Sequence, residues 1–197
     1  MLPLLGLLLL QQDGSLLLEH GVAPAHPLNT SATGVSVVEV EMDGRTRGQQ
    51  TRLLYGKAPF VTPGLNSLMS WSFAVPPGTD VARTSVTFLF RSPATYAVKV
   101  PSMAVKPWGR GLDTSALPQE IVDPGYPVTS VAEGVVILAA KINTEGTVTD
   151  VEKVSGDAAL AEQSRLALKN WKFSPARISA KPVNSTAFVV ISFVRPT

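Results

Sequence analysis

Cysteine is absent from this chain of 197 residues. Its absence excludes disulfide bonds, zinc sites with cysteine ligands and a lipid anchor carried by a cysteine, while the compartment stays open. Histidine is scarce, since His20 and His26 are the only two, and only Glu19 lies beside them as an acidic residue. No serine stands in a Gly-x-Ser-x-Gly nucleophile elbow. We therefore expect no catalytic residue, no metal site and no cofactor.

Charge is also sparse, because charged residues make up 16% of the chain and the formal net charge is +2. No cluster of Lys and Arg residues alternates with aromatic residues, so a nucleic-acid partner is not expected. Apolar residues make up 45% of the chain, which excludes a disordered protein.

A long apolar run is missing as well. Residues Met1–Leu10 are almost entirely apolar, but Asp13 interrupts before the roughly 20 residues that span a bilayer. The length suits an export signal, although the positively charged amino-terminal region of such signals is lacking and Ala23-Pro24-Ala25 is a poor cleavage site. We expect residues 1–21 to be a signal or a remnant anchor that associates with a membrane. In the alternative, Leu16–Leu18 pack on the first folded module.

What the chain does contain is an internal repeat with a spacing of 100 residues. The matched residues include two prolines, two glycines and a Trp-x-Phe element: Pro24, Pro27, Gly34, Gly56, Trp71 and Phe73 fall on Pro124, Pro127, Gly134, Gly156, Trp171 and Phe173. A repeat of this length makes one half the unit of architecture. We therefore predict modules at residues 22–92 and 118–197, joined by a Pro/Gly-rich linker at 93–117.

The second copy has the clearer pattern of secondary structure. Apolar residues 135–142, the turn at 143–146 and β-branched residues 147–154 predict a β-hairpin. Asp157 is the expected N-cap of a helix that stops at Phe173-Ser174-Pro175. After a loop through Lys181-Pro182, residues 185–194 predict a third strand.

The first copy repeats this order with weaker signals. Strands are expected at residues 35–42 and 46–55 and around Val86–Phe90, and Thr62-Pro63 should begin a helix that runs through Trp71. A short strand is expected in the linker at 96–100. The predicted fold class is therefore α+β, with two tandem ββαβ modules, each a small antiparallel sheet packed by one helix. Trp71, Phe73, Trp171 and Phe173 are expected in the cores.

The second copy resembles the TonB carboxyl-terminal domain family over about residues 118–197. The resemblance rests on Tyr126-Pro127, the hairpin, Ser155-Gly156-Asp157, the element Trp171–Ala176 and Lys181-Pro182-Val183 before the final strand. The first copy is similar to the same family only through the repeat, with His26-Pro27 in place of Tyr-Pro, and is predicted to be degenerate.

The resemblance implies a non-enzymatic protein of the periplasm or cell envelope, acting in TonB-dependent transport. Its partner would be an extended segment of an outer-membrane TonB-dependent receptor, or another envelope protein, added to the edge of the last strand. The partner-binding residues would then be Tyr126, Pro127, Thr186, Phe188, Val190 and Ser192. Tyr126 also has a second interpretation, as a cap over the helix.

The chain departs from the family in two respects, and two alternative functions stay open. Members that transmit force have a transmembrane helix with a Ser and a His that engage proton-channel partners, and Met1–Leu10 contains neither; the long Pro-rich linker is also missing. In one alternative the two modules pair their edges with each other, giving a structural envelope protein without energy transduction. In the other, a cleft between the modules binds a small molecule or peptidoglycan through Tyr96 and Trp108.

Overall fold

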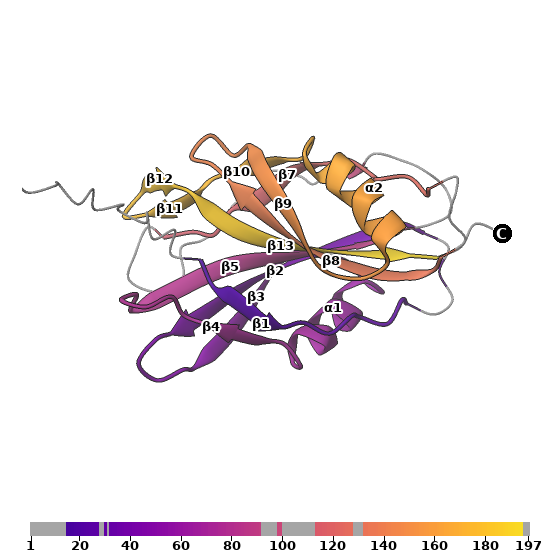
Figure 1. Ribbon diagram of the computed structural model, residues 1–197. Coiled ribbons are helices and arrows are strands. Elements are labelled where there is room, and N and C mark those ends of the chain that lie inside the picture. Colours follow the sequence, from indigo (N-terminus) through magenta and orange to yellow (C-terminus); the bar gives the residue numbers. More distant parts are fainter. Residues whose placement is uncertain are drawn as a thin grey trace, which may run out of the picture.

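A single six-stranded mixed sheet forms the centre of the protein (Figure 1). The computed structural model describes residues 15–27, 30, 32–91, 98–99, 113–127 and 132–194. The strand order across the sheet is β3-β2-β5-β13-β8-β9. The bounds are β2 (Gly34–Asp43), β3 (Gln49–Gly56), β5 (Val81–Phe90), β8 (Gly134–Ile142), β9 (Val148–Ser155) and β13 (Ser185–Phe193).

The two halves of the chain join at the middle of this sheet. Strand β13 pairs in parallel with β5, from Phe188 opposite Val86 to Ser192 opposite Phe90, and it pairs antiparallel with β8 on its other side. All other neighbours in the sheet are antiparallel. The fold is therefore α+β, but the expected free outer edge at the last strand is wrong. A strand whose residues are buried on both faces is stable only in the interior of a sheet.

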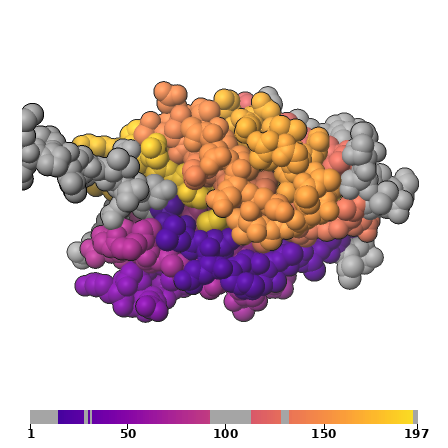
Figure 2. Space-filling view, in the orientation of Figure 1, coloured from indigo at the N-terminus to yellow at the C-terminus, as the bar shows by residue number. Residues whose placement is uncertain are grey.

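One helix covers each face of the sheet. Helix α2 (Ala158–Leu168) lies on one face and α1 (Val61–Leu68) on the other, as Figure 1 shows above and below β13. Alternate residues of β13 supply the two cores, since Val189 and Ile191 pack with α2, whereas Phe188 and Val190 pack with α1. Each core also contains residues of the other half of the chain, and the space-filling view shows the halves as one continuous body (Figure 2).

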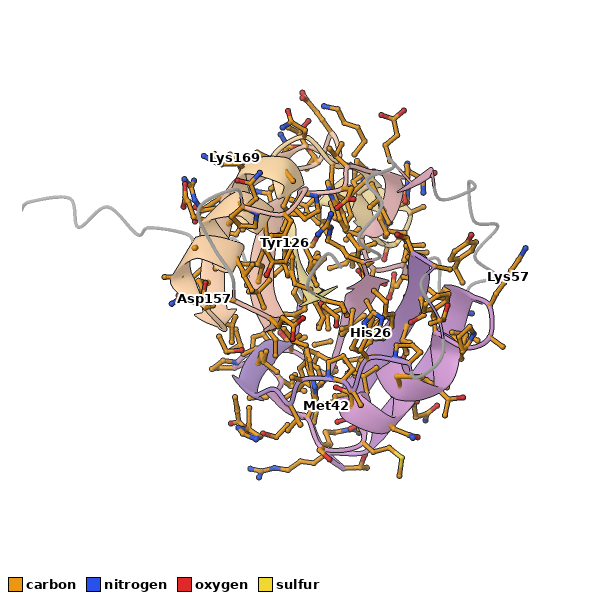
Figure 3. The ribbon with its side chains drawn as sticks, turned by 90° about the vertical axis from the view of Figure 1, so that its right-hand side faces the viewer. His26, Met42, Lys57, Tyr126, Asp157 and Lys169 are labelled. Atoms are coloured by element: carbon orange, nitrogen blue, oxygen red, sulfur yellow. The ribbon has the colours of Figure 1, made fainter. Side chains whose placement is uncertain are left out.

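The two helices begin differently. Asp157 caps α2, because its carboxylate accepts hydrogen bonds from the backbone N–H groups of Ala159 at 2.9 Å and Leu160 at 3.1 Å, which confirms the prediction. Asp157 and Lys169 mark the ends of this helix in Figure 3. The prediction of a Thr62 cap is wrong: α1 already begins at Val61, after Phe60, and has no side-chain cap.

Both helices end earlier than the sequence predicted. They stop at Leu68 and Leu168, and the backbone N–H of Trp71 and of Trp171 donates to the carbonyl of these residues at 3.1 Å. The Trp-x-Phe elements therefore form a turn and a short strand, β4 (Ser72–Ala74) or β10 (Lys172–Ser174), rather than a last helical turn.

Three small sheets complete the fold. Strand β1 (Leu17–His20) pairs with β4, β7 (Leu117–Ile121) pairs with β10 and with β6 (Val98–Lys99), and β11 (Ala176–Ile178) pairs with β12 (Lys181–Val183). Lys181-Pro182 thus lies in a strand rather than in the expected loop, whereas β6 falls within the short strand expected at 96–100.

The start of the described chain packs against the first half. Leu16 is fully buried and Leu18 partly buried in the α1-side core, as the packing alternative expected, whereas Leu17 is exposed. The apolar residues Met1–Leu10 lie outside the described residues. Within the described ranges, no helix has the length and apolar character needed to cross a membrane.

Candidate functional site: strand edges and the junction between the halves

The predicted partner-binding strand lies inside the sheet. Thr186, Phe188, Val190 and Ser192 all belong to β13, whose backbone pairs with β8 along its whole length and with β5 from Phe188 to Ser192. Strand addition needs unpaired backbone N–H and C=O groups on one side of a strand. The outer strands of the six-stranded sheet are instead β3 and β9.

The apolar side chains of this set contact the first half of the same chain. The Phe188 ring centroid lies 6.4 Å from that of Trp71 and 6.0 Å from that of Phe73. Val190 is buried in the same core. Both side chains therefore stabilise the junction of the two halves.

The two polar residues of this set, Thr186 through its backbone and Ser192 through its side chain, also contact the first half. The backbone N–H of Thr186 donates to Oγ of Ser15 at 2.8 Å, and Thr84 Oγ1 donates to the Thr186 carbonyl at 2.8 Å. Oγ of Ser192 lies 3.1 Å from Nδ1 of His26, within hydrogen-bond distance. Burial lowers the pKa of His26, because a buried imidazolium loses its hydration.

Tyr126 and Pro127 lie beside the end of β13, as residues of the approach to the second half. The Tyr126 hydroxyl donates to the Ala132 carbonyl, and its ring meets Phe193 edge-on with centroids 6.1 Å apart. Pro127 is buried. His26 has a related place in the first half, since its ring meets Phe90 edge-on at 5.9 Å (Figure 3). Tyr126 thus packs against the α2-side core, and a partner contact at Tyr126 and Pro127 stays a prediction.

The four predicted core aromatics are buried in the two cores. Trp71 and Phe73 pack on the α1 side, and Trp171 and Phe173 pack on the α2 side. Both indole N–H groups reach a backbone carbonyl, so burial leaves no donor unpaired on these rings.

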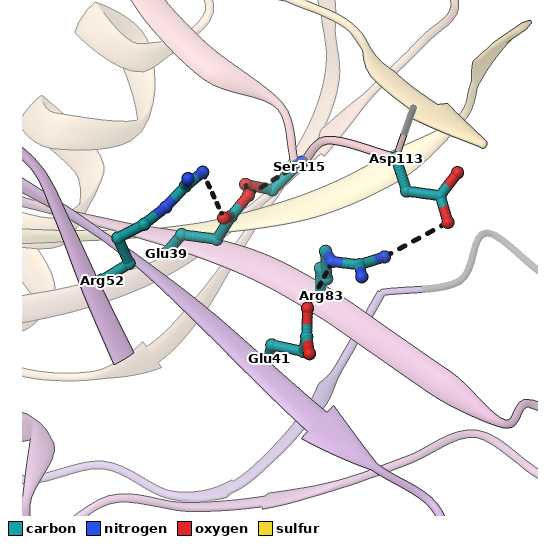
Figure 4. Close-up of polar contacts among 6 residues, drawn as sticks. All are labelled: Glu39, Glu41, Arg52, Arg83, Asp113 and Ser115. Atoms are coloured by element: carbon teal, nitrogen blue, oxygen red, sulfur yellow. Dashed lines mark hydrogen bonds and ion pairs between the residues drawn. The ribbon is translucent and has the colours of Figure 1, made fainter. Parts of the chain in front are cut away.

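A buried carboxylate holds the end of the connecting segment against the first half. Glu39 on β2 is only 1% exposed and accepts hydrogen bonds from Arg52 Nη2 at 2.9 Å, Ser115 Oγ at 2.7 Å and Ser115 N–H at 3.2 Å (Figure 4). Next to it, Arg83 joins Glu41 at 2.7 Å and Asp113 at 3.3 Å. The sequence analysis did not single out these residues. The signal available was acidic residues at alternate positions of an otherwise apolar strand.

A second buried ion pair joins the end of β5 to the segment before Tyr126. Arg91 and Asp123 have side chains that are 1% and 5% exposed, and their contact is bidentate, with Nη2 3.2 Å from Oδ2. The Arg91 guanidinium also lies 5.2 Å from the centroid of the Phe193 ring. This pair therefore links the two halves at the end of β13.

A groove lies along β1, on the α1 face of the sheet. Its volume is about 450 Å³, and its lining includes Leu16–Leu18 of β1, Ala139 and Lys141 of β8, Glu152–Val154 of β9, and Thr186 and Phe188 of β13. No group of three His, Asp or Glu side chains is placed to hold a metal ion anywhere in the described ranges. Tyr96 and Trp108, the aromatic residues of the cleft alternative, lie outside these ranges.

Comparison with known proteins gives one match. A family model described as "Gram-negative bacterial TonB protein C-terminal" matches residues 128–194, which run from just after Pro127 to the end of β13. The comparisons with curated proteins and with solved structures found no match.

Proposed function

Because residues 128–194 match the family model of the TonB protein C-terminal domain, we propose that this chain is a non-enzymatic, TonB-like protein of the Gram-negative cell envelope. Its role is protein interaction in the setting of TonB-dependent transport. In this proposal the family domain is paired with a degenerate second copy of itself, and the pair forms one rigid body.

The order and register of the elements support a duplication. Both halves run from a short strand through a hairpin and a helix to a second short strand and a long final strand, and the second half adds the β11–β12 pair before its final strand. The short strands pair in registers that differ by 100 residues: Leu18 lies opposite Phe73, and Pro118 lies opposite Phe173. The two halves thus correspond in pairing as well as in sequence.

The parallel pairing of β5 with β13 carries the proposal. The resemblance implies that family members bind an extended receptor segment along the edge of the last strand. In this chain that edge is filled by the last strand of the first half. The first copy therefore takes the place of the receptor segment, and we propose that the chain does not grip a receptor through β13 or transmit force by that route.

The energetics favour a permanent junction over an exchangeable one. Separating β5 from β13 would expose Phe188 and Val190 to water on one face and Val189 and Ile191 on the other. Burial of each large apolar side chain contributes about 1.5–3 kcal/mol, so opening would cost as much as a domain's typical net stability.

Hydrogen exchange of the full chain, combined with a peptide titration, tests this proposal. We expect the amides of β5 and β13 to exchange only through global unfolding. An amino-terminal peptide of an outer-membrane TonB-dependent receptor should leave the NMR signals of residues 185–193 unchanged. Fast exchange along β13, or shifts there that saturate with the peptide, would show an accessible edge and reject the proposal.

A further inference from the structure

Strands β1 and β7 occupy corresponding places in the two halves. Leu17 pairs with Ala74 and His20 with Ser72, while Leu117 pairs with Ser174 and Glu120 with Lys172. Each strand thus lies beside the short strand that follows the Trp residue of its own half. A structural element that lies beside one of these two strands is therefore expected to have a counterpart beside the other strand.

The second side of these strands differs between the halves. Strand β7 has a partner there, because β6 pairs with it antiparallel, with Val98 opposite Ile121 and Lys99 opposite Glu120. Strand β1 has β4 alone as a partner among the strands of the described ranges. Within the part of the chain that the structure describes, the edge that β6 completes in the second half therefore has no strand beside β1.

The open side of β1 borders the groove of about 450 Å³. Figure 2 faces this side, where atoms of β13 are visible between the indigo start of the described chain and the orange second half. Leu17 of β1 is 53% exposed and Val154 of β9 is 43% exposed, so apolar side chains remain in contact with water on both walls. Phe188 and Ala139 lie in the lining between them.

The corresponding place in the other half is filled by side chains. There Glu39 on β2 takes the position of Ala139, and its carboxylate bridges Ser115 and Arg52. The small side chain of Ala139 leaves this volume empty on the β1 side. Charged side chains also line the groove. Lys141 is paired with Asp150 at 3.0 Å, and Glu152 and Lys153 contribute one charge of each sign.

We propose that the open side of β1 binds an extended segment of a partner protein, added antiparallel to β1 as β6 is added to β7. Backbone pairing with β1 supplies affinity, and apolar side chains at alternate positions fill the groove between Leu17 and Val154. A short apolar segment fits better than an edge strand of a second copy, because β1 has four residues and the site lies between two walls. The proposal rests on the protein-interaction role proposed above and names its surface.

A peptide with the sequence of residues 94–102, which contains β6, is the probe. It is titrated into the full ¹⁵N-labelled chain, and we expect saturable shifts at Leu17–Gly21 and at Val154. A matched peptide with proline at the position of Val98 lacks a backbone N–H and should not bind. A scrambled peptide of the same composition controls for non-specific apolar contact.

Two matched variants of the full chain locate the site. Val154→Arg places a charge in the apolar groove and should weaken binding by about tenfold or more, whereas Leu166→Arg, on the exposed side of α2, should leave binding unchanged. Both variants change an exposed apolar residue to arginine, so their stability should fall little.

Each remaining outcome contradicts the proposal. Shifts confined to Leu117–Ile121 would mean that the peptide only replaces β6, and equal binding by Val154→Arg would place the contact elsewhere. Protection, before peptide is added, of those Leu17–His20 amides that do not pair with β4 would mean that the chain itself fills the groove. Shifts along β5 and β13 would instead reject the proposed junction between the halves, so the two failures are distinguishable.

Discussion

The indole N–H of Trp171 donates a hydrogen bond of 2.9 Å to the backbone carbonyl of Val122. One hundred residues earlier, the indole N–H of Trp71 donates to the carbonyl of Val22 at 2.8 Å. The two contacts differ in one respect, because the Val22 carbonyl also accepts from Ser67 Oγ at 2.5 Å. Within the part of the chain that the structure describes, the Val122 carbonyl accepts from the indole alone.

We predict that Trp171→Phe destabilises the protein more than Trp71→Phe. Both changes remove ring volume, but only the first leaves a carbonyl without a donor, which costs about 1–3 kcal/mol. Urea unfolding of both variants measures the difference. Equal losses would contradict the prediction and would mean that water replaces the indole at Val122. As a control, Ser67→Ala combined with Trp71→Phe removes both donors from the Val22 carbonyl and should bring the loss closer to that of Trp171→Phe.

Replacing Arg91 with Met should be among the most destabilising single changes. It would leave the Asp123 carboxylate buried without its partner, which typically costs about 3–5 kcal/mol. The double variant Arg91→Met with Asp123→Asn should recover part of this loss, because no unpaired charge remains. A double-mutant cycle by urea unfolding measures the coupling, and additive losses would contradict a direct pairing.

The second half should not fold alone as a monomer. A chain of residues 113–197 would expose Phe188, Val190 and Ile137, which the first half covers in the full chain. We expect it to be unfolded, or to associate through β13, as seen by circular dichroism and sedimentation velocity. A stable folded monomer would show that the second half does not depend on the first.

Stability should decrease as the pH falls from about 7.5 to 5.5, partly because of His26. Burial places the pKa of His26 below its ordinary value of 6.5. Between these two pKa values the unfolded chain binds more protons, so the free energy of unfolding rises with pH there. His26→Gln should flatten this slope in urea unfolding, since glutamine does not titrate. This pH range lies above the pKa of about 4 that is ordinary for carboxylates. An unchanged slope would assign the pH dependence to other groups.

Local patterns predicted the large elements well. The hairpin of β8 and β9 follows from an apolar run, the turn residues Asn143–Gly146 and a β-branched return strand. Asp157 marked the helix start because its side chain can reach the N–H groups of the first turn. Such signals involve residues close in sequence, so a single chain displays them directly.

The position of β13 was harder to predict, although one signal was present. Residues Phe188–Ile191 form an unbroken apolar run, which is typical of a strand covered on both faces and not of an edge strand. The resemblance to the family instead implied an outer edge at this strand. The pairing of β1 with β4 and the burial of Glu39 depend on segments more than 50 residues apart, and no local pattern specifies them.

The parallel junction also limits how many copies can assemble in this manner. Corresponding strands of the two halves meet at this junction, so the edge that each half contributes there is used by a single neighbour. A junction of this kind joins two halves and no more, as the interface of a symmetric dimer joins two subunits.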